Sequence, residues 1–106
     1  MTERLSSVHP GRILRFDFLE PLELTPYRLA KEIHVPLTRV TAILAGRRSI
    51  TADTAMRLAR YFGTTTQFWL NLQALYEMQE ARALGIDGEL ERIRPWRKDG
   101  EPTAAW

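Results

Sequence analysis

Apolar positions between residues 24 and 46 repeat with the spacing of two short helices joined by a tight turn. The first helix begins at Thr25, a favourable N-cap residue that is followed by Pro26 at the first helical position, and it ends near Ile33. A turn of about three residues follows. Pro36 then starts the second helix, which ends at Gly46.

The second of these helices has two unlike faces. Its core stripe consists of Val40, Ile43 and Leu44, whereas the opposite face carries small and mildly polar side chains: Thr38, Thr41, Ala42 and Ala45. Such a face can lie close to a flat surface that presents base edges, and the DNA major groove is wide enough for one helix. The pattern therefore predicts a helix-turn-helix that reads DNA.

Three further helices surround this pair in the sequence. One is expected from His9-Pro10 to about Leu19, with Ile13, Leu14 and Phe18 directed into the core. Another begins after Thr51 and ends at Gly63, and its apolar stripe is unbroken over Ala55, Leu58, Ala59 and Phe62. The longest begins at Thr65 or Thr66 and ends near Leu84, with Gly85 as its stop signal.

Residues 86–106 have a different composition, in which glycine, proline and alternating charges predict little stable structure beyond a short helical turn at 89–93. The chain has 106 residues, which favours one domain. No stretch has the alternation of a strand. We therefore expect an all-α, five-helix bundle over residues 1–85 that contains the DNA-binding and dimerisation surfaces, followed by a weakly structured tail over 86–106.

The charge is distributed unevenly, although the net charge is only +2. Residues 25–63 carry six arginines and one lysine against Glu32 and Asp53, a net charge of +5, whereas residues 1–24 carry −1 and residues 64–106 carry −2. The basic surplus thus coincides with the helix-turn-helix and the helix after it, as a phosphate-binding face requires. This surplus also disfavours a module that binds only other proteins.

Several classes of function find no support in the sequence. There is no cysteine, and the two histidines, His9 and His34, both fall at expected helix caps or turns. No carboxylate pair, glycine-rich phosphate loop or HExxH motif is present, so we expect no enzyme, cofactor or metal site. No apolar run approaches the roughly 18 residues of a membrane span, and the N-terminus lacks the apolar region of a signal peptide, so we expect a cytoplasmic protein.

Three short segments add a more specific signal: HPG at residues 9–11, AGRRSIT at 45–51 and FWLNLQ at 68–73. Together with the helix-turn-helix they resemble the HigA/VapI branch of the Xre-type helix-turn-helix antitoxins, from about His9 to Tyr76. The resemblance implies a λ-repressor-like domain that dimerises on a palindromic operator in its own promoter, within a type II toxin–antitoxin module. It also implies a partner toxin of the RelE/HigB-like, mRNA-cleaving type. His34 departs from the pattern, because glycine is frequent at this turn position, but histidine tolerates left-handed geometry better than most residues.

The predicted DNA-binding residues fall into three groups. Thr38, Thr41 and Ala42 face base edges, and Arg39 at their flank reaches a guanine or a phosphate. At the start of the preceding helix, free backbone donors and a cation are placed to hold a phosphate, while two more arginines clamp the backbone after the recognition helix. These two groups are Thr25, Tyr27 and Arg28, and Arg47 and Arg48. Thr25 also caps its helix, and packing of Tyr27 on the first helix remains an alternative.

The longest helix is too apolar on all sides to be a lone surface helix, which predicts a homodimer. Its predicted interface residues are Trp69, Leu75, Tyr76 and Met78, whereas Phe68 and Leu72 are expected to complete the core of each monomer. Two copies would then read half-sites about one DNA turn apart, roughly 34 Å. A stand-alone Xre-type transcriptional regulator without a toxin remains the alternative, because both use the same DNA-binding domain.

Overall fold

The computed structural model describes residues 8–97, and every regular element in that range is helical. This confirms the predicted all-α class, with the five expected helices and a short helix in the tail. The elements are α1 (Pro10–Ile13), η1 (Leu14–Leu19), α2 (Pro26–Ile33), α3 (Leu37–Leu44), α4 (Ala52–Phe62), α5 (Thr66–Ala83) and α6 (Ile86–Leu90).

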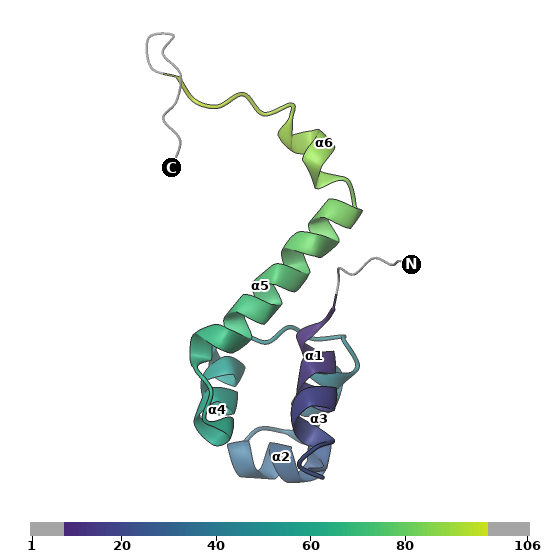
Figure 1. The fold of residues 1–106 in the computed structure, drawn as a ribbon, viewed down its shortest axis with the longest axis vertical. Coiled ribbons are helices and arrows are strands. Elements are labelled where there is room, and N and C mark those ends of the chain that lie inside the picture. The colour runs from purple at the N-terminus through teal and green to yellow at the C-terminus, as the bar shows by residue number, and fades with distance from the viewer. Residues whose placement is uncertain (1–7, 98–106) are drawn as a thin grey trace.

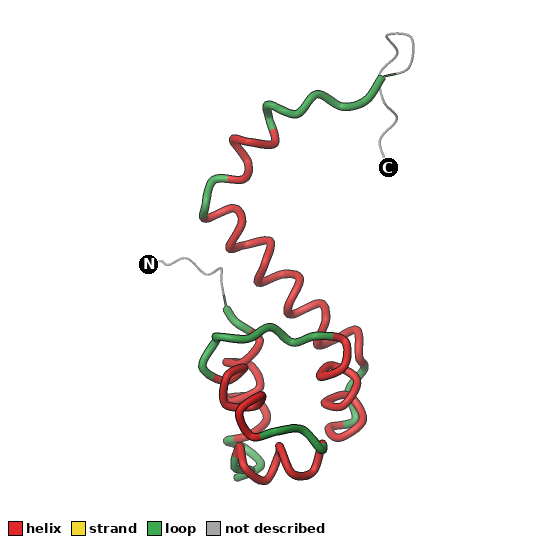
Figure 2. Tube along the Cα trace, turned by 180° about the vertical axis from the view of Figure 1, so that it is seen from behind, coloured by secondary structure: helices red, strands yellow, loops and turns green. Residues whose placement is uncertain are grey.

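The helices divide into a bundle and an extension. The segments from α1 to α4 and the start of α5 pack together, and the rest of α5 leaves the bundle and leads to α6 (Figure 1). The same arrangement is visible from behind, where α5 runs away from the cluster of shorter helices (Figure 2). The two halves of α5 therefore lie in different surroundings.

The core takes one fully buried large side chain from each of five successive elements. These are Leu14 of η1, Leu29 of α2, Ile43 of α3, Leu58 of α4 and Trp69 of α5, each no more than 1% exposed. Burying an apolar side chain of this size stabilises a fold by about 1.5–3 kcal/mol. The apolar stripes predicted for α2, α3 and α4 are thus the ones that the fold buries.

The first helix differs from the expected regular α-helix. It begins as α1 and continues as a π-helix, in which the Glu20 N–H donates to the Arg15 carbonyl, five residues earlier, at 2.9 Å. The wider turn places Leu14 and Leu19 in the core, at 1% and 3% exposure. Ile13, expected in the core on α-helical spacing, is only half-buried. The buried positions Leu14 and Leu19 are five residues apart, and the i, i+3 and i+4 spacing of an α-helix does not predict such a pair.

The HPG segment is explained by the packing of α1 on α3. The His9 Nδ1 accepts a hydrogen bond from the Gly11 N–H at 2.9 Å and so caps α1. A Cβ at Gly11 would lie 2.0 Å from the Ile43 carbonyl oxygen, so only glycine permits this approach of the two helices. Pro10 between them is fully buried.

Three threonines cap helices as their sequence positions indicate. The hydroxyl oxygen of Thr25 accepts from the Arg28 N–H at 3.1 Å, that of Thr51 from the Thr54 N–H at 3.5 Å, and that of Thr65 from the Phe68 N–H at 3.0 Å. Thr65 rather than Thr66 therefore begins α5.

The tail contains a helical segment of the expected length, but at a different place. The helical turn predicted for residues 89–93 is replaced by α6 at Ile86–Leu90, which starts directly after Gly85 in its left-handed conformation (φ 95°). Residues 98–106 of the predicted tail lie outside the described part of the chain.

Candidate nucleic-acid interface

The two faces of α3 are divided as the sequence predicts. Val40, Ile43 and Leu44 are buried, at 2%, 1% and 7% exposure, whereas Thr38 and Thr41 are exposed and Ala42 is half-buried. The Thr41 hydroxyl donates to the carbonyls of Leu37 (3.2 Å) and Thr38 (3.3 Å) within its own helix. Its proton is thereby engaged, so Thr41 offers DNA an acceptor oxygen and a methyl group.

The turn between α2 and α3 is closed by His34 in left-handed geometry, with φ 64° and ψ 48°. Its N–H and that of Val35 donate to carbonyls of the last turn of α2, at Lys31 (3.4 Å) and Ala30 (3.0 Å). Histidine thus occupies the conformation that glycine provides more easily. This turn sets the direction of α3 relative to α2.

The start of α2 offers one free backbone donor rather than several. Pro26 has no N–H, and the N–H groups of Arg28 and Leu29 donate to the side chain and the carbonyl of Thr25. Within the described residues this leaves the Tyr27 N–H to bind an external acceptor. The Tyr27 side chain is 63% exposed, so it does not pack into the bundle as the alternative required.

Arg28 is held along α2 by a carboxylate. Its Nε lies 2.5 Å from one oxygen of Glu32, and the Tyr61 hydroxyl of α4 donates to the other. These hydrogen bonds, from Tyr61 first and Arg28 second, hold the pKa of Glu32 below its usual range. Arg28 remains mostly exposed, with 65% of its side chain in contact with solvent, so it is still available to a phosphate.

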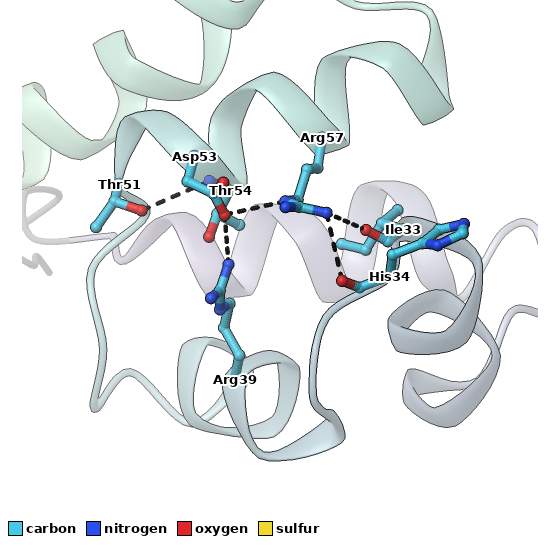
Figure 3. A network of polar contacts seen from close by, with 7 residues as sticks. All are labelled: Ile33, His34, Arg39, Thr51, Asp53, Thr54 and Arg57. Atoms are coloured by element: carbon cyan, nitrogen blue, oxygen red, sulfur yellow. Dashed lines mark hydrogen bonds and ion pairs between the residues drawn. The ribbon is translucent and has the colours of Figure 1, made fainter.

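Arg39 is not a free cation at the flank of α3. Its Nη1 lies 2.5 Å from Oδ2 of Asp53 in the first turn of α4, and its side chain is only 23% exposed (Figure 3). Asp53 had no place among the predicted site residues. The pairing of Asp53 with Arg57 (3.0 Å) is foreseeable from their i, i+4 spacing, whereas the contact with Arg39, fourteen residues away, is not.

Arg47 and Arg48 are exposed in the link between α3 and α4. This link is anchored on both sides of them. After the two arginines, the Ile50 N–H donates to the buried Oε1 of Gln73 on α5 at 2.9 Å. Before them, Gly46 lies next to the His9 ring, which is 3.9 Å from the position that a Cβ at Gly46 would take. The two guanidinium groups thus extend from a fixed backbone.

One predicted interface residue on α5 is placed wrongly. Trp69 is 0% exposed and cannot meet a second chain, because its ring packs on Phe18 and Phe68 at 5.0 Å and its Nε1 donates to the Thr64 hydroxyl at 2.7 Å. Phe68, expected in the core, is instead 36% exposed. Because apolar and polar residues are mixed around the whole circumference of α5, its periodicity could not distinguish the two faces.

The other α5 residues divide between the monomer and its surface. Leu75 and Met78 are 48% and 50% exposed, and with Phe68 they lie on one face at helical spacing. Tyr76 is half-buried and packs edge-on against the His9 ring, with the ring centroids 4.9 Å apart. The exposed apolar side chains on this face of α5 are Phe68, Leu75 and Met78, of which Phe68 also packs on Trp69.

No group of three or more histidine, cysteine or carboxylate side chains in the described residues could hold a metal ion. No helix in this part of the chain is long and apolar enough to cross a membrane.

Comparison with known proteins agrees with this geometry. A helix-turn-helix family matches residues 17–69, half of the chain. Virulence-associated protein I of Dichelobacter nodosus is 47% identical over 77 residues, which cover 73% of this chain and 71% of the relative.

Two solved structures extend the likeness beyond the matched domain. An addiction module antidote protein of the HigA family from Coxiella burnetii is 43% identical, with a TM-score of 0.80 over 87% of this chain and 100% of that one. The Pseudomonas aeruginosa antitoxin HigA, solved with the higBA promoter, is 40% identical, with a TM-score of 0.79 over 84% of this chain and 97% of that one. The chain therefore belongs to the HigA/VapI branch of the Xre-type helix-turn-helix antitoxin family.

Proposed function

We propose that this protein is an antitoxin that binds a palindromic operator in its own promoter as a homodimer, represses its operon, and neutralises a RelE/HigB-like, mRNA-cleaving toxin. Its place of action would be the cytoplasm, and we assign it no catalytic step. The observation that carries the DNA-binding part is the small, exposed face of α3 with exposed arginines on the adjoining segments. The Pseudomonas aeruginosa relative, solved with promoter DNA, supports it.

Affinity and specificity would come from different residues. Arg28, Arg47, Arg48 and the Tyr27 N–H would bind phosphates and fix the register of the domain on the duplex. Thr38, Thr41, Ala42 and Arg39 would read base edges, since threonine hydroxyls accept hydrogen bonds and the methyl groups of threonine and alanine contact thymine methyls.

The dimer would form through the free face of α5, namely Phe68, Leu75 and Met78. One recognition helix covers too little DNA for specific repression, and two copies related by a two-fold axis match a palindrome. Trp69, committed to the monomer core, has no part in this interface.

DNA binding is tested by fluorescence anisotropy with a duplex from the region upstream of the gene. Replacing Arg47 and Arg48 by alanine should weaken binding at least tenfold and lower the salt dependence by about two released counterions. The double variant Arg92→Ala, Arg94→Ala is the matched control, because both residues are exposed after α6 and the pair removes the same two positive charges. Equal losses in both variants would contradict the assignment.

The toxin is tested by co-expression with the small open reading frame adjacent to the gene. Growth arrest by that product alone, relief by this protein, and a complex that purifies as one species would support the antitoxin role. Specific operator binding without toxicity or complex formation would instead favour the stand-alone regulator.

A further inference from the structure

Asp53 lies at the centre of a chain of polar contacts that connects the helix-turn-helix to α4 (Figure 3). Arg57 on α4 donates to the carbonyls of Ile33 (2.9 Å) and His34 (3.3 Å), where α2 ends. The same guanidinium donates from its Nε to Oδ2 of Asp53 at 3.0 Å. Arg57 thus holds the Asp53 carboxylate in place relative to the turn after α2, whether or not Arg39 is bound to it.

Arg39 reaches this fixed carboxylate from the recognition helix. Its Nη1 donates to Oδ2 of Asp53, and its Nε is buried without a hydrogen-bond partner among the described residues. A guanidinium carries five N–H donors in one plane. One N–H of Nη1 is used by Asp53 and the Nε–H is buried, so the remaining N–H groups of Nη1 and Nη2 are left for another acceptor. The contact with Asp53 also restricts the rotation of the Arg39 side chain.

This arrangement suits a base better than a phosphate. A guanine edge presents two acceptors, O6 and N7, in the geometry of the terminal guanidinium donors, and recognition requires the plane to be held in one orientation. A phosphate, by contrast, rewards net positive charge, which the paired carboxylate reduces. Arg57 first, and Arg39 second, hold the pKa of Asp53 below its usual range, so the carboxylate is ionised at neutral pH.

We propose that Asp53 is a positioning residue for DNA recognition, which holds the Arg39 guanidinium at the flank of the Thr38–Thr41 face so that its terminal donors meet a guanine in the major groove. The inference rests on the proposed operator binding and adds a determinant of specificity that does not itself touch DNA. Asp53 would lower affinity for any DNA slightly, through its charge, and raise discrimination in favour of the operator.

The test compares dissociation constants for the operator duplex and for a scrambled duplex of the same length and composition. In Asp53→Asn the dissociation constant for the operator should rise about tenfold, because one well-formed bidentate contact is lost. The dissociation constant for the scrambled duplex should stay the same or fall. In an Arg39→Ala background the same substitution should leave the ratio of the two constants unchanged, because Asp53 acts through Arg39. Asp17→Asn makes the same chemical change at an exposed position of η1 and should leave both constants unaltered.

Three results would overturn the inference. Equal weakening on both duplexes would show that Asp53 only supports the fold, and tighter operator binding would show that it sequesters Arg39. A further loss of discrimination between the two duplexes in the Arg39→Ala background would show that Asp53 acts through a group other than Arg39. If Asp53→Asn does not fold, Arg39→Lys decides, because it keeps the charge, loses the planar fork, and should lose discrimination about tenfold. Failure of the unaltered protein to discriminate would sink operator binding itself, whereas discrimination that survives in Asp53→Asn would sink this inference alone.

Discussion

The helix-turn-helix and the outer half of α5 are both helical and both rich in apolar residues, but only the first is complete within one chain. In α2 and α3 the six apolar stripe residues are all buried, at 7% exposure or less. The Thr25 side chain caps the start of α2, and left-handed His34 and Gly46 follow the ends of α2 and α3. In α5 beyond the bundle Leu75, Met78 and the following Leu84 are 48%, 50% and 86% exposed. The difference locates where the chain buries its own apolar residues and where the proposed dimer would cover them.

The contrast also separates two kinds of role for arginine. Arg28, Arg39 and Arg57 are each fixed by a carboxylate or by backbone carbonyls. Arg47 and Arg48 extend freely from the link after α3. We therefore expect Arg39 and Arg57 to determine geometry, whereas Arg47 and Arg48, together with the mostly exposed Arg28, determine affinity for phosphate.

The largest predicted effect is at the point where α5 joins the bundle. Trp69→Ala should lower the free energy of unfolding by about 3–5 kcal/mol, since it empties the centre of an aromatic cluster. Trp96→Ala, at a tryptophan that is 70% exposed, should change it by less than about 0.5 kcal/mol. Urea denaturation followed by circular dichroism measures both. Similar changes in the free energy of unfolding for the two variants would contradict the assignment of Trp69 to the core and of Trp96 to the surface.

A glycine substitution should act with opposite signs in the two regions. Gly11→Ala places a methyl group 2.0 Å from the Ile43 carbonyl oxygen and should cost about 3 kcal/mol of unfolding free energy. Gly88→Ala, in α6, meets no atom within 4 Å and should favour that helix by up to about 1 kcal/mol. Denaturation gives the first value and amide hydrogen exchange within α6 gives the second. A stable Gly11→Ala protein would refute the close approach of α1 and α3.

A smaller effect should appear with pH at His9. Burial lowers the pKa of His9 below 6.5, although a backbone hydrogen bond with Arg48 opposes this, and Nδ1 must be unprotonated to accept from Gly11. The unfolded chain therefore binds a proton more readily than the folded one. The contribution of His9 to stability is complete above about pH 6.5 and is lost as the pH falls below it, with a slope of at most about 1.4 kcal/mol per pH unit.

His9→Asn separates this effect from other titrations, because it keeps a capping acceptor that does not titrate. Unfolding free energies measured between about pH 7 and 5 should be flatter in the variant than in the unaltered protein. The lowered pKa values of Glu32 and Asp53 place their own losses of stability at lower pH. An identical slope in the variant would show that His9 is not the group responsible.

Sequence reasoning succeeded where the signals were local. The caps at Thr25 and Thr51 and the division of α3 into two faces follow from residue type and periodicity over a few positions. It failed where the decisive contact was distant or the geometry unusual. The π-helix shifted the core from Ile13 to Leu19, and the aromatic cluster that buries Trp69 joins η1, α4 and α5.

The same limit applies to the candidate site. The sequence predicts Arg39 as a member of the site, but its partner Asp53 is fourteen residues away and on another helix. A helical wheel contains no information on such a pair. For α5, the exposed face can be identified only from the packed bundle, which buries Trp69 and Gln73.

We expect the free face of α5 to join two chains so that two recognition helices read one operator. Native mass spectrometry of the protein with its operator duplex tests it directly, with the double variant Leu75→Glu, Met78→Glu beside the unaltered protein. We predict two chains per duplex for the unaltered protein, and a folded monomer without bound operator for the variant at the same concentration. One chain per duplex, or a variant that binds as two chains, would contradict the account.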